Sequence, residues 1–312
     1  MVQKSVIIVC RSESMDDFHQ IARRAHRLDP SITVIPIAEH LHSSLIPKPL
    51  LNLPMLVIFL VNPPDKEFHV AGKMAVKHIT KLEEYEHFKK HNIPCLPIED
   101  FTWGMALDKS IYGDWVVLKP QTIQSTGKDV NMVPTDLIPT LTLEDFPADH
   151  LIRQDQYYVQ KFVKTGDRPR QYRAIVFLGA ILHTKFNILN FPYPNDDSNL
   201  NTLLRNTVAS NYTGHREAIL TINDEFNEIA IEVAKKFSNF PLLGLDMIQD
   251  PATKKIYVLE TNSGGNTWHF SSQISKKLGF VDPAQIKPMI LQYKAWDKAA
   301  EALIQKTHEF AK

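Results

Sequence analysis

The sequence predicts a mixed α/β and α+β protein in which a parallel sheet is followed by antiparallel strands. Short apolar runs alternate with helical patterns over residues 5–120, which is typical of a parallel sheet with crossover helices. From Trp115 onward, β-rich segments follow one another closely, which indicates antiparallel pairing. A chain of 312 residues has the length of two domains, or of one domain with a large insertion.

Strands and helices alternate in the first half of the chain. Strands are predicted at 5–10, 31–37 and 55–61, because these runs are short and apolar. Residues 15–28 have the spacing of an amphipathic helix, with its apolar face formed by Phe18, Ile21, Ala22, Ala25 and Leu28. A charged helix is predicted at 79–91, ending before Pro94, and another at 101–111.

Strands dominate the second half. They are predicted at 115–119, 157–163, 171–178, 180–186, 242–249 and 256–261, with hairpin turns at 177–180 and 250–255. Helices are predicted at 224–237 and, up to the end of the chain, at 283–311. Residues 187–216 are polar and rich in asparagine, and we expect them to form a functional flap because structureless connections of this length are uncommon.

Composition narrows the class of protein. Lys plus Arg and Asp plus Glu both total 35, so the net charge is +0 and the chain lacks the basic excess with which proteins grip nucleic acid. The longest apolar stretch, 50–61, contains Asn52 and Pro54 and is too short to span a membrane. Cys10 and Cys95 are far apart, so neither a disulfide framework nor a cysteine zinc site is expected. We therefore expect a folded protein of the reducing cytoplasm.

Three oxygen-bearing side chains lie on two neighbouring predicted strands. Asp246 lies within one apolar strand, Glu260 near the end of the next, and Asn262 points to the same face as Glu260 because side chains alternate. A hairpin would bring them together as hard oxygen ligands of the kind that Mg²⁺ prefers. The alternative is a salt-bridged carboxylate pair at a strand edge with a turn asparagine.

Two basic side chains end or line strands of the same half. Lys119 follows the apolar run 115–118 and is followed by a loop with Ser125, Thr126 and Lys128, which favours an anion such as a phosphate, although the loop is not a Walker motif. Arg173 alternates with apolar residues and is suited to bidentate phosphate binding. The alternatives are a lysine that reaches solvent and an arginine in a surface ion pair.

Taken together and in this order, these motifs resemble the ATP-grasp superfamily. The resemblance covers about 79–272 and is strongest at Gly244-Leu245-Asp246 and Leu259-Glu260-Thr261-Asn262. It is closest to glutathione synthetases and ribosomal-protein glutamate ligases. It implies a Rossmann-like domain at 1–78 and an ATP-grasp domain at 79–312, with a central lobe at 79–163 and a C-terminal lobe at 164–312.

The resemblance also implies ligands and roles for individual residues. ATP would bind between the lobes with two Mg²⁺ ions, or Mn²⁺ in their place, and the metal ligands would be Asp246, Glu260 and Asn262. Nucleotide contacts are implied for a longer set: Lys81 and Lys119 at the phosphates, Gln160, the Lys161 carbonyl and the Val163 N–H at the adenine hinge, and Asp167 at the ribose. Arg173 matches the family's phosphate or substrate arginine. Apart from the resemblance, Arg205, Asn211 or Arg216 from the flap would help Arg173 to orient the carboxylate; the alternative is that they are solvated loop residues.

The implied activity is ATP-dependent ligation of a carboxylate to an amine or thiol through an acylphosphate, with release of ADP and phosphate. The alternatives are a kinase of the same fold that phosphorylates an alcohol, and a nucleotide-binding module without turnover. The expected partners are small-molecule or peptide acids and amines, and neither nucleic acid nor membrane; the sequence leaves monomer and homodimer open.

Three departures from the family pattern carry consequences. The loop after Lys119 has a single glycine, where family members usually have several, so we expect a different closure over the nucleotide. Gln160 replaces the usual hinge glutamate. Gly244 stands where D-alanine ligases carry an arginine, which disfavours that subgroup.

Overall fold

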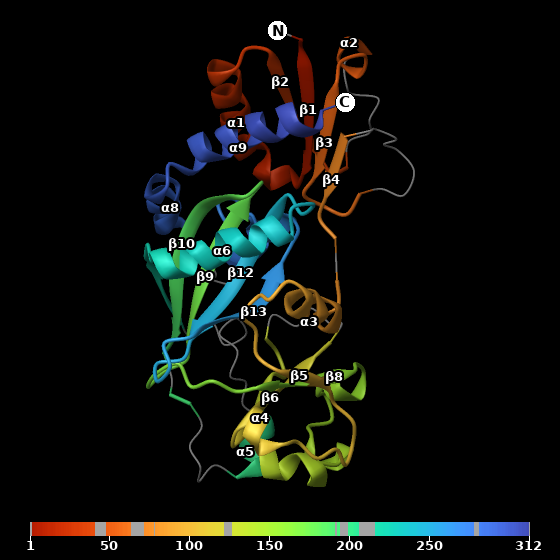
Figure 1. The fold of residues 1–312 in the computed structure, drawn as a ribbon, viewed down its shortest axis with the longest axis vertical. Coiled ribbons are helices and arrows are strands. Elements are labelled where there is room, and N and C mark those ends of the chain that lie inside the picture. Colours follow the sequence, from red (N-terminus) through yellow and green to blue (C-terminus); the bar gives the residue numbers. More distant parts are fainter. Residues whose placement is uncertain are drawn as a thin grey trace.

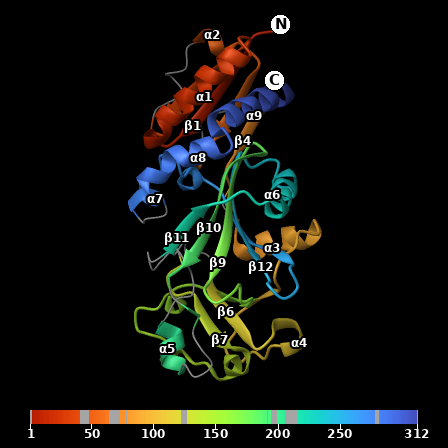
Figure 2. The same cartoon turned by 90° about the vertical axis from the view of Figure 1, so that its left-hand side faces the viewer.

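Three β-sheets follow one another along the length of the molecule (Figure 1). The structure, a computed structural model, describes residues 2–40, 48–63, 72–77, 79–121, 127–190, 192–193, 199–205, 216–277 and 281–311. Figure 2 shows the same order from the side: the first sheet and its helices at one end, a long antiparallel sheet in the middle and a smaller sheet at the other end. The mixed α/β and α+β fold class predicted from the sequence is confirmed.

The first sheet is parallel and has the strand order β2-β1-β3-β4. Its strands are β1 (Lys4–Cys10), β2 (Ile32–Ala38), β3 (Met55–Phe59) and β4 (Gly72–Ala75), and the short helix α2 (Lys48–Leu51) precedes β3. Helix α1 (Met15–Leu28) buries Phe18, Ile21 and Ala25, as its periodicity predicts, but Leu28, which was predicted on the same face, is 57% exposed at the end of the helix. The strand β4 was not predicted.

The middle sheet, which we call the large sheet, is antiparallel with the order β11-β10-β9-β12-β13. Its strands are β9 (Arg170–Phe177), β10 (Ala180–Leu189), β11 (Arg216–Leu220), β12 (Leu242–Gln249) and β13 (Ile256–Asn262). The predicted hairpin between β9 and β10 is confirmed: Leu178 and Gly179 both have positive φ, +50° and +89°, as a two-residue turn of this kind requires. Helix α6 (Asp224–Lys236), capped by Asn223, covers one face.

The third sheet, the small sheet, is antiparallel with the order β5-β8-β6-β7. It consists of β5 (Ile98–Asp100), β6 (Trp115–Pro120), β7 (Asn131–Pro134) and β8 (Tyr157–Lys161), with α4 (Lys109–Tyr112) beside it. Helix α5 (Leu200–Arg205) lies at this end of the molecule although it follows β10 in the chain (Figure 1). It is held there by Asn131, whose amide donates to the carbonyls of Leu203 and Leu204.

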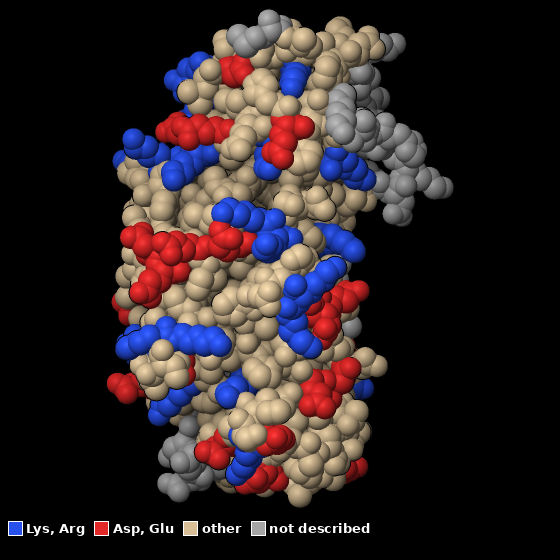
Figure 3. All heavy atoms as spheres, viewed as in Figure 1, with Lys and Arg blue, Asp and Glu red and all other residues tan. Residues whose placement is uncertain are grey.

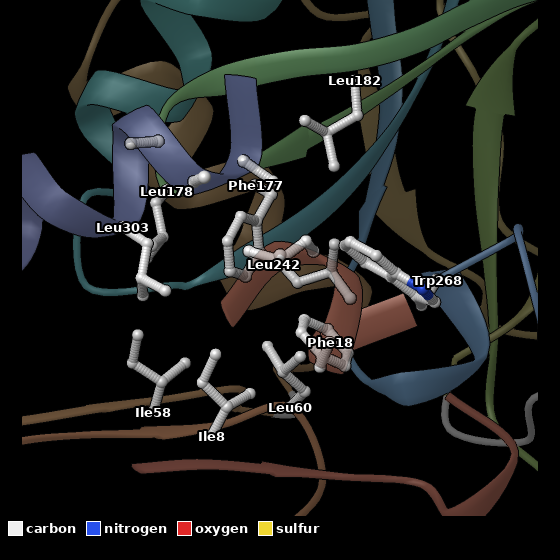
Figure 4. Close-up of a cluster of buried hydrophobic side chains, with 14 of the residues drawn as sticks. Ile8, Phe18, Ile58, Leu60, Phe177, Leu178, Leu182, Leu242, Trp268 and Leu303 are labelled. Atoms are coloured by element: carbon white, nitrogen blue, oxygen red, sulfur yellow. The ribbon is translucent and has the colours of Figure 1, made fainter. Parts of the chain in front are cut away.

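One apolar core joins the first sheet to the upper end of the large sheet. Figure 4 shows Phe18 of α1 beside Trp268, with Phe177 and Leu242 of the large sheet in the same cluster. The Phe18 and Trp268 ring centroids are 4.6 Å apart, and the Trp268 indole N–H donates to Asp17. Because the two sheets share this core, the segment after β13 is fixed against α1.

Two predicted helices differ from the structure for local reasons. In the predicted helix 101–111 only α4 is helical, because Gly104 has φ +79° and Trp103 turns to pack between Phe101 and Phe146. The predicted helix 283–311 is divided at Lys294, whose φ is +53°, into α8 (Ile286–Gln292) and α9 (Ala295–Phe310). The division lets α8 contact β10 while α9 returns to pack on α1.

Helix α3 (Lys81–Lys90) lies between the large and small sheets. Thr80 and Glu83 form a reciprocal capping box at its start, which fixes Lys81 as the first helical residue. After the helix, the Pro94 carbonyl accepts from the Val258 N–H, so the chain is attached to β13 before it enters the small sheet. The short helix α7 (Gln273–Lys277) follows the segment after β13.

The described helices and the face drawn in Figure 3 bear on the predictions about membranes and charge. In the described part of the chain, no helix combines the length and apolar character needed to cross a bilayer. Figure 3 shows basic and acidic side chains interspersed over the face drawn there, without a large patch of one sign. This distribution fits the balanced charge of the sequence.

Candidate active site

A row of charged side chains crosses the large sheet from strand to strand. The register pairs Lys185 of β10 with Arg173 of β9, Arg173 with Asp246 of β12, and Asp246 with Glu260 of β13. Side chains of directly paired residues project from the same face of a sheet. The row therefore runs from two cations to two carboxylates, on the face opposite the one that α6 covers.

Asp246, Glu260 and Asn262 converge at the acidic end of the row. The Asn262 amide nitrogen lies 3.2 Å from Asp246 Oδ2 and 3.0 Å from Glu260 Oε1. Burial, reinforced by the charge of Glu260, raises the pKa of Asp246 to about 6. Burial would also raise the pKa of Glu260, but Lys81 and Lys119 outweigh it and hold that pKa well below its usual value.

These three side chains fit a magnesium ion. Asp246 Oδ1 is buried and has no hydrogen-bond partner among the described residues, so one carboxylate oxygen is available to a ligand. Asn262 now presents its nitrogen to the carboxylates, and a turn of the amide would present Oδ1 instead. The candidate ligand set consists of two carboxylates and an amide, which are hard oxygen donors of the kind that Mg²⁺ prefers.

Lys81 reaches the acidic end from α3. Its Nζ lies 3.1 Å from Glu260 Oε2 and 3.3 Å from Glu84 Oε2. Burial alone would lower the pKa of Lys81, but the two carboxylates raise it. Glu84, which is 2% exposed, also accepts from the backbone N–H and hydroxyl of Thr261 on β13. Glu84 thus holds Lys81 against β13, the strand that carries Glu260 and Asn262.

Lys119 approaches from the small sheet. Its Nζ donates to Gln160 Oε1 at 2.6 Å, across the β6–β8 pair. Burial lowers the pKa of Lys119, although the charge of Glu260 opposes this shift. Lys81 from α3 and Lys119 from the small sheet therefore both act electrostatically on Glu260.

The predicted adenine hinge lies beside this site. A small pocket is lined by residues that include Lys81, Leu96, Ile98, Tyr158, Gln160 and Leu259. The Lys161 side chain points away and donates to the Ile111 carbonyl, so only its backbone is left for a nucleotide. Val163 is half-buried and Asp167 exposed in the segment that leads to β9. The nucleotide contacts of these residues stay a prediction.

Gly244 makes room for the guanidinium of Arg173. A Cβ at position 244 would lie 2.9 Å from Arg173 Nη2, 3.2 Å from its Nε and 2.8 Å from Thr267 Cγ2. Arg173 is thereby placed over β12, where its Nη1 donates to Asp246 Oδ2 in a short hydrogen bond. Its Nε is buried and has no hydrogen-bond partner among the described residues. Because position 244 is a glycine, the guanidinium of Arg173 on the neighbouring strand fits above β12, where it places a positive charge beside Asp246.

The basic end of the row continues beyond Arg173. Lys185 is 1% exposed, and burial together with the charges of Arg216 and Arg173 lowers its pKa to about 7. Burial and Arg173 lower the pKa of Arg216 to about 10. Two buried histidines, His183 of β10 and His269 after β13, have ring centroids 5.6 Å apart.

The predicted flap residue Arg205 does not join the row. Arg205 ends α5 at the small sheet, is exposed and donates to Asn201. Asn211 lies outside the described residues, as do Ser125 and Thr126 of the loop after Lys119. Arg216, in contrast, begins β11 on the large sheet. The functional roles assigned to Arg205 and Arg216 stay predictions.

Four residues beside the site were missed or left without a role by sequence reasoning. Glu84, His183 and Lys185 were not singled out, and His269 was noted only as part of a small-residue loop. His183 and Lys185 share the spacing of two that marks one face of a strand, so the strand pattern contained a signal for them. Nothing in a helix pattern distinguishes Glu84 from the other acidic residues of α3.

Comparisons with known proteins identify the fold. No protein-family model and no curated protein matches the chain. Among solved structures, D-cycloserine synthetase DcsG is similar at 14% identity and a TM-score of 0.52, covering 97% of this chain and 99% of that one. An ATP-grasp ligase from Chryseobacterium gregarium, in complex with ADP and a leader and core peptide, matches at 11% identity and 0.52, with 97% of each chain covered.

A third similar structure is the ATP-grasp ligase PsnB complexed with a minimal precursor. It has 11% identity, a TM-score of 0.51, and covers 98% of this chain and 100% of that one. Similarity at this level of identity over nearly whole chains speaks for a common fold rather than a common substrate. The chain therefore has the ATP-grasp fold, as the resemblance in its sequence predicts.

Proposed function

We propose that this protein is an ATP-dependent ligase that activates a carboxylate as an acylphosphate and transfers the acyl group to an amine or thiol. The observation that supports this proposal most strongly is that two lysines, from α3 and from the small sheet, lie close to the polar cluster of the large sheet. The lysines are Lys81 and Lys119, and the cluster consists of Asp246, Glu260 and Asn262. Phosphoryl transfer needs positioning and charge stabilisation rather than a side-chain nucleophile. This site offers both.

The ion pairs at the site would exchange partners when Mg-ATP binds. Lys81, now paired with Glu260, would turn to a phosphate oxygen, and Lys119 would leave Gln160 for another. Asp246, Glu260 and an Asn262 that presents Oδ1 would hold Mg²⁺, which when bound offsets the charge on the transferring phosphoryl oxygens. The existing pairs keep the buried charges neutralised in the absence of nucleotide.

The proposed reaction has two steps. A carboxylate oxygen of the acid forms a bond to the γ-phosphorus while the bond between that phosphorus and the bridging oxygen breaks, which releases ADP. The amine nitrogen then adds to the acyl carbon, loses a proton, and phosphate leaves. The Arg173 Nε, which lacks a partner among the described residues, is suited to donate to an oxygen of the acid or of the transferring group.

Trapping with hydroxylamine tests this proposal without knowledge of the natural amine. The protein is incubated with Mg-ATP, hydroxylamine and a panel of carboxylic acids that includes hydroxy acids, and acyl hydroxamate, phosphoester, ADP and phosphate are measured. A ligase forms hydroxamate, ADP and phosphate in equal amounts. A kinase of the same fold forms ADP and a stable phosphoester without free phosphate, and a module without turnover forms none of them; either outcome refutes the ligase.

A further inference from the structure

We infer that Glu84 of α3 is a positioning residue for the reaction, which holds Lys81 in place when Glu260 leaves that lysine for the metal ion. The inference rests on the proposed ligase function and adds a residue that acts through its neighbours rather than on the reacting atoms. The same carboxylate fixes the backbone of β13 between Glu260 and Asn262. Glu84 thereby couples the lysine proposed to bind phosphate to the strand proposed to bind metal.

The first argument is the exchange of partners at Lys81. Its Nζ lies 3.1 Å from Glu260 Oε2 and 3.3 Å from Glu84 Oε2. In the proposed Mg-ATP complex Glu260 binds the metal, so Glu84 is the carboxylate that stays with the lysine. Losing both carboxylates would be costly for Lys81, because burial alone lowers its pKa and the two carboxylates raise it. Glu84 therefore keeps Lys81 charged and directed at the site.

The second argument is that Glu84 is itself held in place. It is 2% exposed, and its Oε1 accepts from the Thr261 backbone N–H at 2.5 Å and from the Thr261 hydroxyl. Burial raises the pKa of Glu84, while the charge of Lys81 and the hydrogen bonds from Thr261 oppose this rise. Because one oxygen faces Thr261 and the other faces Lys81, the carboxylate cannot follow Glu260 to the metal without breaking these contacts.

The third argument is an irregularity of β13 at this point. The strand β13 lies at the edge of the large sheet, and Leu259 is skipped in its register with β12, where the pairing passes from Glu260 directly to Val258. Extra residues of this kind bend a strand and are common beside active sites, where they aim a side chain. The direction of the Glu260 side chain therefore depends on how β13 is held around Leu259.

Hydrogen bonds to the chain around α3 hold β13 on both sides of Leu259. Before it, the Val258 N–H donates to the Pro94 carbonyl at 2.7 Å, and after it the Thr261 N–H donates to Glu84. Figure 1 shows α3 beside β13. The capping box fixes the first turn of α3, and residues three apart share a helix face, so Glu84 and Lys81 are presented to β13 together.

The variant Glu84→Gln separates the charge of this residue from its shape. It keeps the size of the side chain and an oxygen for Thr261, but removes the charge beside Lys81. Calorimetry measures ATP affinity in EDTA and in saturating Mg²⁺, and we call the ratio of the two affinities the magnesium gain. In the variant the metal must compete for Glu260 with a lysine that has lost its second carboxylate.

We expect the magnesium gain of Glu84→Gln to fall by about tenfold, the size of one charge-assisted contact. The kcat for hydroxamate formation should fall by about 10- to 100-fold, because Lys81 is no longer held in position. ATP affinity in EDTA should not fall, since the variant removes a negative charge near the phosphates. A residue that only supported the fold would weaken ATP binding with and without Mg²⁺ alike.

Two controls assign these effects to the pair. Glu86→Gln, on the same helix, changes an exposed glutamate that pairs with Lys89 at 3.2 Å, also three residues away, and should keep the wild-type magnesium gain and kcat. In a Lys81→Met background, Glu84→Gln should change the magnesium gain by less than about twofold, because the two residues act together. Circular dichroism and thermal unfolding show whether each variant is folded.

The outcomes separate this inference from the ligase proposal. A wild-type magnesium gain or a wild-type kcat in Glu84→Gln overturns the inference and leaves the ligase standing, as does an equal loss of ATP affinity in EDTA and in Mg²⁺. Absence of hydroxamate from the wild type with every acid overturns both. If Glu84→Gln does not fold, Glu84→Asp decides: it draws the charge back by about 1.5 Å, so kcat and the magnesium gain should both fall, and wild-type values overturn the inference.

Discussion

The space above Gly244 offers a sharp test of how Arg173 is positioned. In Gly244→Ala the new methyl would lie 2.9 Å from Arg173 Nη2 and 2.8 Å from Thr267 Cγ2, each about half an ångström closer than ordinary contact. Arg173 is only 11% exposed and is bonded to Asp246, so it cannot turn to solvent without losing that bond. The guanidinium must therefore shift.

The size of the effect follows from that shift. Overpacking in a buried site costs about 1–3 kcal/mol in the free energy of unfolding. Misplacement of a positioning group by about 1 Å reduces turnover by up to about 100-fold. We expect kcat for hydroxamate formation to fall by about 10- to 100-fold, whereas ATP affinity should change by less than about threefold, because Lys81 and Lys119 are untouched.

A double-mutant cycle with Arg173→Lys provides the control. Lysine lacks the Nη2 and Nε atoms that the methyl would meet, so Gly244→Ala should cost much less in that background, and the two effects on kcat should be non-additive. Urea unfolding measures the free energy of unfolding, calorimetry measures ATP affinity, and steady-state rates give kcat. Wild-type kcat in Gly244→Ala, or additive effects in the cycle, would refute the claim that Gly244 leaves the space in which the Arg173 guanidinium is positioned.

Three further predictions address the remaining parts of the site. Glu260→Gln should fold but lose about 100-fold or more in kcat, because a metal ligand loses its charge; the exposed Glu217→Gln is the control, and unchanged turnover at saturating Mg-ATP would remove Glu260 from the site. Lys119→Ala should weaken ATP binding in calorimetry by about 1–3 kcal/mol, whereas Arg173→Lys should lower kcat with little change in ATP affinity; equal losses of affinity in both would contradict separate roles. Burial, with the charges of Arg216 and Arg173, lowers the pKa of Lys185 to about 7, below its value in the unfolded chain, so the free energy of unfolding should rise as pH increases above about 7 and Lys185→Met should reduce this rise; an unchanged pH profile of stability in Lys185→Met would contradict it.

Much of the fold was predictable because its signals are local. The helix Met15–Leu28 and most strands are encoded by periodicity, and the turn at Leu178 and Gly179 by a short break between two apolar runs. The return of α9 to the first sheet and the position of α5 beside the small sheet depend on contacts between residues far apart in the chain. Such contacts leave no periodic pattern, so they were not predicted.

The site shows the same division. Asp246, Glu260 and Asn262 were singled out because polar residues in apolar strands are conspicuous, and the register places the two carboxylates side by side. Glu84 was missed because its burial depends on the docking of α3 against Thr261. Lys185 was missed because an isolated lysine in a strand is ordinarily at the surface, and only the neighbouring strands bury this one.

Isotope transfer from the acid to phosphate tests the central claim most directly. An acid that supports hydroxamate formation is labelled with ¹⁸O in its reacting carboxylate, and the phosphate released with Mg-ATP is analysed by mass spectrometry. Attack of the carboxylate on the γ-phosphorus predicts one labelled oxygen in each phosphate released during acyl transfer. Unlabelled phosphate, at the same yield of hydroxamate, would contradict an acylphosphate and with it the proposed mechanism.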